Sequence, residues 1–378
     1  MNHSFTDTIL ALLADRFGEL STMVFEHSPL LQYLNIKTRS ASSGSKARGA
    51  FANHYALYVL IEDYIKKGFV SNKKGQYLDY EGARFGDLLR RQRELPFGAK
   101  LQNHALNSRL NDEFAKYFPT LERRPVLRDQ QEQRYWVNES LLLIPVLRSG
   151  HQMTVNIAEA IIEIIDAYVS VKRSAFQAFI DLSKQIAALS NADAAEGMAF
   201  IRQQLQPHID ARIFEIISFA LLKAHYGEQS IFWGWTLDNL NQQHLMLYKT
   251  GRTNANDGGI DFVMKPLGRF FQVTETADVN KYFLDLDKIN KFPLTFVIKT
   301  VQDTGTVLIQ IRRYAEAKYG VTAIVERYMN AIEEIITIPT LISIFETLAS
   351  SGQVQAVMRE IVMQSQVEFN DEHVDAPD

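Results

Sequence analysis

The run from Thr250 to Thr276, TGRTNANDGGIDFVMKPLGRFFQVTET, constrains the fold of this chain more than any other segment. Its first part is rich in Gly and Asn, which tolerate left-handed backbone angles, and this composition predicts a loop. Ile260–Met264 and Arg269–Thr276 are predicted to be strands, and Lys265–Gly268 is the tight turn that joins them. The run therefore predicts a β-hairpin that follows a glycine-rich loop.

This hairpin brings chemically useful side chains together. If the chain reverses midway through the turn, Asp261 lies opposite Gln272, because both are equally far from the centre. Period-two alternation puts Gln272 and Thr274 on one face of the second strand, with Phe271 and Val273 on the other. An acid, an amide and a hydroxyl are thus expected on one side of an apolar hairpin.

The segments around the hairpin predict an α/β domain. A helical apolar stripe follows Pro207 and ends near Gly227, where a helix C-cap is expected. Further strands are predicted at His244–Tyr248 and Leu294–Lys299, with an amphipathic helix at about 277–290. The order is helix, three strands, helix, strand, and Trp233 and Trp235 are expected to pack beneath the resulting sheet.

Most of the remaining chain has helical periodicity. Further helices are expected at 5–27, 155–189, 306–319, 321–336 and 340–364. The small, polar stretch Ser190–Gly197 is the best candidate for a domain boundary. We therefore predict three regions: 1–195, mostly helical; 200–320, the α/β core; and 321–378, a helical C-terminal extension with an acidic tail.

Composition narrows the function classes. The chain has no cysteine, which excludes disulfides and thiolate-bound metals and fits a reducing cytoplasm. We expect neither a signal peptide nor a membrane span. The net charge is −4, but residues 34–134 hold 19 Lys and Arg against 11 Asp and Glu. This local excess is either an ordinary solvated surface or a site for phosphate contacts.

The segment 207–300 resembles the catalytic centre of PD-(D/E)XK nucleases, particularly the variant of Mrr-like restriction enzymes. In that variant a glycine-rich turn precedes a strand of the form G-I-D, and a short hairpin leads to Q-x-K. The resemblance implies that the turn is Asp257-Gly258-Gly259 and that Asp261 is the metal-ligating acid. It also implies that Gln272 is its second-strand partner in binding the metal and that Glu215 is the catalytic glutamate of the preceding helix.

The resemblance is incomplete at one position. Thr274 stands where the family has its lysine, and a hydroxyl cannot supply a positive charge to the attacking water or the phosphate. One explanation is that Lys281 on the following helix reaches the site, with Lys249 and Lys299 as further candidates. The other explanation is a degenerate site that binds DNA without cleaving it.

The resemblance implies a type II restriction endonuclease: an Mg²⁺-dependent, sequence-specific hydrolase of double-stranded DNA. A palindromic target would call for a homodimer, and a cognate DNA methyltransferase gene is expected nearby. The large helical N-terminal region would contribute to DNA recognition and dimerisation. The candidate DNA-binding residues are Arg90, Arg91, Arg93, Asn103, Arg109, Arg252 and Asn254. The alternative is a non-catalytic or repair-type DNA-binding protein on a degenerate nuclease fold.

Overall fold

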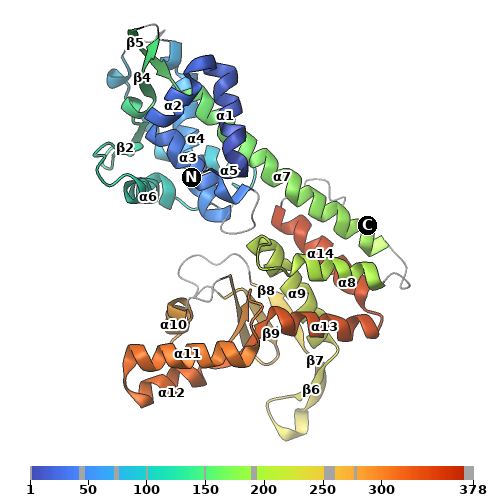
Figure 1. Cartoon of the computed structure of the whole chain (residues 1–378). Helices are drawn as coiled ribbons and strands as arrows, with labels where there is room; N and C mark the ends of the chain where they lie inside the picture. The colour runs from blue at the N-terminus through green and yellow to red at the C-terminus, as the bar shows by residue number, and fades with distance from the viewer. Residues whose placement is uncertain are drawn as a thin grey trace. The chain divides into compact units, whose positions relative to one another are not determined.

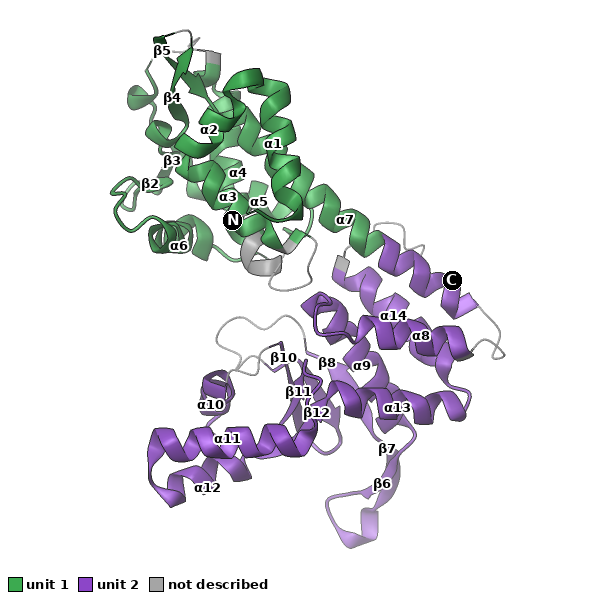
Figure 2. Ribbon diagram, in the orientation of Figure 1, with its two compact units in different colours: residues 1–177 green, residues 178–378 purple. Residues whose placement is uncertain are grey.

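The computed structural model describes residues 2–41, 47–71, 76–98, 101–148, 150–188, 194–250, 260–275 and 279–369. The chain divides into two compact units, residues 1–177 and 178–378, coloured green and purple in Figure 2. Helix α7, Ala158–Ala188, contributes residues to both units. Among the described residues, none of the helices combines the length and the apolarity that crossing a membrane takes.

Unit 1 is built mainly from helices around a core rich in aromatic side chains (Figure 1). Its helices are α1 (Ser4–Phe17), α2 (Ser21–His27), α3 (Pro29–Thr38), α4 (Ala47–Lys66), α5 (Phe85–Glu94) and α6 (Leu110–Tyr117). The central helix α4 is buried along residues 51–61. Over this stretch α4 is apolar on nearly all sides, and a helix of that kind is buried in a core, unlike an amphipathic surface helix.

Unit 1 also contains strands, so the prediction of a mostly helical region 1–195 overlooked part of its structure. One sheet has the order β1-β3-β2, formed by Ala83–Arg84, Arg134–Val137 and Val126–Asp129. A separate hairpin consists of β4 (Leu143–Arg148) and β5 (His151–Asn156). These strands are short, and β2 buries only Val126. Such strands leave little period-two alternation in the sequence.

A buried histidine makes unit 1 sensitive to acid. His54 on α4 is fully buried, its ring lies 4.9 Å from that of Tyr168, and neither ring nitrogen has a hydrogen-bond partner within the described residues. Burial, with a smaller effect from the charge of Lys37, lowers the pKa of His54 to about 3. In the unfolded chain a histidine has a pKa of about 6.5, so it is protonated at a higher pH than the buried ring of the folded protein. The folded state therefore loses stability as the pH falls from about 6.5 towards 3.

We expect His54→Leu, which is similar in volume, to remove this contribution. Between pH 7 and pH 5, the opening free energy of α4 should fall by about 2 kcal/mol more in the wild-type protein than in the variant. Hydrogen exchange of peptides from α4, measured at both pH values, gives this difference directly. An equal pH dependence in the two proteins would show that His54 does not stay neutral in the folded state.

Unit 2 centres on a five-stranded mixed sheet. Its helices are α8 (Ala194–Gln204), α9 (Ala211–Gly227), α10 (Val279–Lys288), α11 (Thr304–Tyr319), α12 (Thr322–Asn330), α13 (Ile338–Ser350) and α14 (Val354–Phe369). The sheet strands are β8 (Met246–Lys249), β9 (Phe262–Lys265), β10 (Arg269–Thr274), β11 (Leu294–Ile298) and β12 (Ile332–Thr337). A separate ribbon pairs β6 (Ser230–Trp233) with β7 (Asn241–His244).

The sheet has the order β12-β11-β10-β9-β8. Strands β8, β9 and β10 form an antiparallel meander, whereas β10, β11 and β12 are parallel. The predicted helix, three strands, helix and strand occur in that order as α9, β8, β9, β10, α10 and β11, but two strands that the sequence did not predict, β6 and β7, lie between α9 and β8. The hairpin register is also confirmed, because Phe271 pairs with Phe262 and Arg269 with Met264.

Helices pack against both faces of this sheet. Helix α9 lies against one face, where Phe219 contacts Phe262 at a ring-centroid distance of 5.1 Å. Helix α10 lies against the other, where Tyr282 contacts Phe296 at 5.1 Å. Phe296 pairs with Gln272 across the parallel β10–β11 ladder, so Gln272 belongs to the α10 face.

The prediction of one helix in the C-terminal extension is partly wrong. The sequence indicates a helix at 321–336, but α12 ends at Asn330 and Ile332–Thr337 forms β12 at the edge of the sheet. The run IEEIIT fits both a helical stripe and a strand, and its pairing with β11 decides in favour of the strand.

Candidate active site

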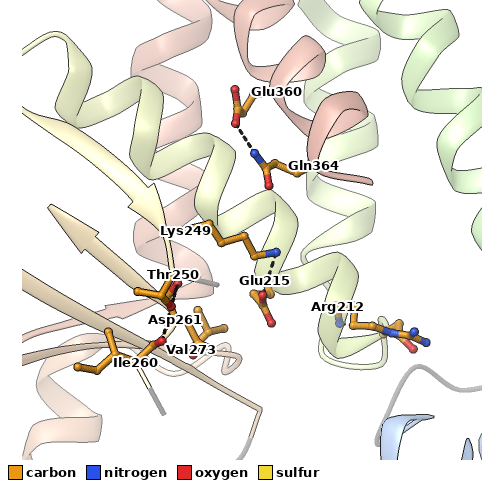
Figure 3. A network of polar contacts seen from close by, with 10 residues as sticks. Arg212, Glu215, Lys249, Thr250, Ile260, Asp261, Val273, Glu360 and Gln364 are labelled. Carbon is orange, nitrogen blue, oxygen red and sulfur yellow. Dashed lines mark hydrogen bonds and ion pairs between the residues drawn. The ribbon is translucent and has the colours of Figure 1, made fainter. Parts of the chain in front are cut away.

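Asp261 lies at the start of the hairpin, where the β9–β10 ladder ends (Figure 3). Its N–H donates to the carbonyl of Phe271 at 2.9 Å, and the N–H of Val273 donates to its Oδ2 at 2.7 Å. These two bonds flank Gln272 on the neighbouring strand. The expected juxtaposition of Asp261 and Gln272 therefore follows from the backbone, and the carboxylate replaces a missing ladder partner of Val273.

Gln272 has an unusual environment for an amide. Only 8% of the residue is exposed, and its Nε2 donates to the carbonyl of Val273 at 3.2 Å. Its Oε1 is buried and accepts no hydrogen bond from any described residue. Leaving a buried acceptor unpaired costs about 1–3 kcal/mol, so such atoms call for an explanation. A bound cation or water would satisfy this oxygen.

The ammonium group of Lys281 lies beside Thr274. Thr274 is buried two residues after Gln272 on β10. The Nζ of Lys281, from the first turns of α10, donates to the Oγ1 of Thr274 at 3.4 Å. Lys281 therefore brings an ammonium group to Thr274 from a neighbouring helix, as proposed from its position in the sequence.

Glu215 and Lys249 form a second polar contact on the α9 side of the sheet. The Nζ of Lys249 lies 2.9 Å from the Oε1 of Glu215, and both side chains are largely buried. Lys249 pairs with Phe262, next to Asp261, and the N–H of Thr250 donates to the carbonyl of Asp261 at 2.9 Å. Figure 3 shows the side chain of Lys249 reaching from β8 to Glu215 on α9. Lys249 is thus paired with the glutamate that the family resemblance implies.

Lys299, the remaining lysine candidate, is held by other groups. Its side chain is almost completely buried, and its Nζ lies 3.2 Å from the Oε1 of Glu275 and donates to the carbonyl of Ile209. These contacts tie the end of β11 to the end of β10 and to the segment before α9. Glu275 was not identified from the sequence, because only the parallel pairing of β10 with β11 brings it close to Lys299.

The candidate DNA-binding residues of unit 1 differ in how they are engaged. Arg91 makes two bonds of 2.9 Å to Glu62, Arg90 pairs with Asp87, and the Nε of Arg93 donates to the carbonyl of Leu101 at 3.2 Å. Asn103 is half-buried, and Arg109 is exposed. Arg252 and Asn254 lie outside the described residues. Of these four arginines, Arg90, Arg93 and Arg109 are exposed, whereas Arg91 is half-buried.

The ligand set for a metal is small. Within the described ranges, no group of three or more His, Cys, Asp or Glu side chains is arranged to hold a metal ion. The donors on the hairpin are the Asp261 carboxylate and the unpaired Oε1 of Gln272. Both are hard oxygen ligands, as Mg²⁺ prefers, and this ion commonly keeps several waters while binding one or two protein carboxylates and a substrate phosphate. The residues present therefore fit a sparsely ligated Mg²⁺.

Comparisons of the chain with models of protein families, with curated proteins and with solved structures found no match.

Proposed function

We propose that this chain is an Mg²⁺-dependent endonuclease of the PD-(D/E)XK type that cleaves double-stranded DNA, acting in the cytoplasm as a type II restriction enzyme. The observation that carries the proposal is the hairpin site. The Asp261 carboxylate lies beside the buried amide of Gln272, whose Oε1 has no hydrogen-bond partner among the described residues. The ammonium group of Lys281 reaches Thr274, two residues further along the strand. The order of helices and strands around the site agrees with the family resemblance.

Each residue has a defined role in this proposal. Asp261 and Gln272 would hold Mg²⁺, which when bound acts as a Lewis acid on the phosphate and lowers the pKa of a water. Lys281 would stabilise the negative charge that develops on the phosphate during attack. Glu215, paired with Lys249, would keep α9 and β8 in register beneath the hairpin. These roles require only hydrolysis, with no redox or covalent intermediate.

The second candidate function is DNA binding without cleavage, including a repair-type role on a degenerate nuclease fold. Thr274 in place of the family's lysine favours it, and so does the absence, among the described residues, of a group of three acidic or histidine ligands. In that case the basic segment 34–134 would supply the phosphate contacts.

Incubation of the intact protein with supercoiled plasmid separates the two functions. Discrete linear fragments with Mg²⁺, and none with a chelator, are expected for a restriction endonuclease. Retarded plasmid without any strand break, over a range of divalent metals, would contradict the enzymatic proposal and support the binding protein. Sequencing the fragment ends would then give the target, which we expect to be palindromic. A DNA methyltransferase gene next to this one would add independent support.

A further inference from the structure

Residues Ser230–His244 form a ribbon, here called the arm, inserted between α9 and β8. Ser230 pairs with His244 and Trp233 with Asn241, and no third described strand joins them. In Figures 1 and 2 the arm extends away from the five-stranded sheet of unit 2. An isolated two-stranded hairpin is marginally stable in water, so a ribbon of this kind normally packs against something.

The arm presents large apolar side chains to solvent. Trp235 is 89% exposed, Leu237 87% and Phe232 71%, with Trp233 and Leu240 partly exposed as well. The expectation that Trp233 and Trp235 pack beneath the sheet is therefore wrong. Tryptophan is usually well buried, and adjacent exposed aromatic groups mark an interaction site rather than an ordinary surface.

The tip that carries these side chains is ordered by its own hydrogen bonds. The N–H of Thr236 donates to the Oδ1 of Asn239 at 2.9 Å, and the N–H of Asn239 donates to the carbonyl of Thr236 at 3.2 Å. Gly234 is required here, because a Cβ at this position would lie 2.5 Å from the carbonyl oxygen of Asn239. A tip formed in advance loses little conformational entropy when it binds a partner.

The exposed apolar area is large enough to anchor a protein interface. Phe and Trp side chains bury about 150–250 Å² each, so Phe232, Trp233 and Trp235 together expose on the order of 450 Å². A standard interface buries about 800 Å² per partner. Phe232 and Trp233 are successive residues of β6 and point to opposite faces of the ribbon, so one contact takes Trp235, Leu237 and one of these two, about half of that area. Tryptophan is also among the residues most often dominant in binding energy.

Charge identifies the class of partner. Between Ser230 and His244, Asp238 is the only Asp, Glu, Lys or Arg. A DNA- or RNA-binding ribbon needs cations for the phosphates, and this one has none. A strongly charged protein partner would likewise meet no complementary charge. An apolar surface with a single charged residue brings little like charge against its own copy, and the same patch lies on both sides of a two-fold interface.

We propose that the arm is a dimerisation element, and that it packs against the arm of a second copy of this chain about a two-fold axis. Trp235 and Leu237 form the centre of the contact, and the amide side chains of β7 lie at its rim. A pair of chains joined through their arms would be the homodimer expected for the proposed function. The contact itself depends on the arm alone, so it can be tested without DNA or metal.

The test measures the mass of the full-length protein by sedimentation velocity from about 0.1 to 50 µM. The wild-type protein is expected to be a dimer at the upper concentrations. Trp235→Ser combined with Leu237→Ser should weaken dimerisation at least 100-fold, because two central apolar contacts are lost from each copy. The matched control is Leu78→Ser in unit 1, whose side chain is exposed to the same degree, at 88%, and which should leave the mass unchanged.

Single-cysteine crosslinking locates the contact. The chain has no cysteine, so Asp238→Cys introduces the only thiol at the tip of the arm. Mild oxidation should join two copies, whereas Leu78→Cys should not. A monomeric wild-type protein, or a dimer that is unaffected by the two arm substitutions, would overturn the proposal. So would arm substitutions that leave the mass unchanged but weaken DNA binding, and these would identify nucleic acid as the partner.

Discussion

Asp261→Asn is expected to lower the rate of Mg²⁺-dependent plasmid cleavage by about 10³-fold or more. The substitution keeps an oxygen that can accept the hydrogen bond from the Val273 N–H, which lies 2.7 Å from Oδ2 in the wild-type protein. It removes the negative charge of the carboxylate that would hold the divalent cation beside Gln272. Losing a single group that stabilises a transition state already costs 10²–10³-fold in other enzymes, and a metal ligand contributes to several such interactions.

The measurement is the rate of strand cleavage under single-turnover conditions, with enzyme in excess over plasmid. Asp15→Asn, an exposed acid in unit 1, is the control and should cleave at the wild-type rate. The thermal unfolding curve should be the same for Asp261→Asn and the wild-type protein, because the hydrogen bond is kept. A cleavage rate within tenfold of wild type would exclude Asp261 as the metal ligand.

Lys281→Met is expected to lower kcat by about 10²–10³-fold with a much smaller change in KM. Its ammonium lies 3.4 Å from the Oγ1 of Thr274 and, in the proposed function, would act on charge that develops only in the transition state. An interaction of this kind affects kcat rather than substrate binding. Methionine keeps the length and packing of the stem, so α10 should remain in place.

Two further variants make the Lys281 result specific. Lys265→Met removes an exposed lysine at the far end of β9 and should leave kcat unchanged. Thr274→Lys in the Lys281→Met background returns an ammonium group to the same space from β10, and cleavage should recover in part. If Lys281→Met cleaves at the normal rate, the positive charge comes from elsewhere, and Lys249→Met is the next variant to measure.

The sequence was informative where local rules decide the structure. The hairpin register was predictable because the turn, in which Gly268 has a φ of +67°, fixes where the chain reverses its direction. That position decides which residues of the two strands pair. The pairing of Asp261 with Gln272 depends on that register alone. Lys281 was a reasonable candidate because the next helix must return over the strand that it follows.

The rest depended on contacts distant in sequence. The pairings Glu215–Lys249 and Glu275–Lys299 require the sheet to be assembled, and the spacing of the residues does not predict them. The pattern of β12 suits both a helix and a strand, and only its pairing with β11 decides between them. The sequence of the arm predicts buried tryptophans, because nothing in it shows that they lie on a ribbon that no described element covers.

The way the arm joins unit 2 has an evolutionary consequence. The N–H of Leu245 donates to the carbonyl of Gln229 at 3.0 Å, so the two ends of the arm are held together where it leaves the domain. A ribbon anchored at such a junction can lengthen, shorten or be lost without moving α9 or β8. We therefore expect related chains to keep the hairpin of Asp261 and Gln272 while their arms diverge rapidly. Dimerisation through the arm would then change from one lineage to the next independently of the hairpin.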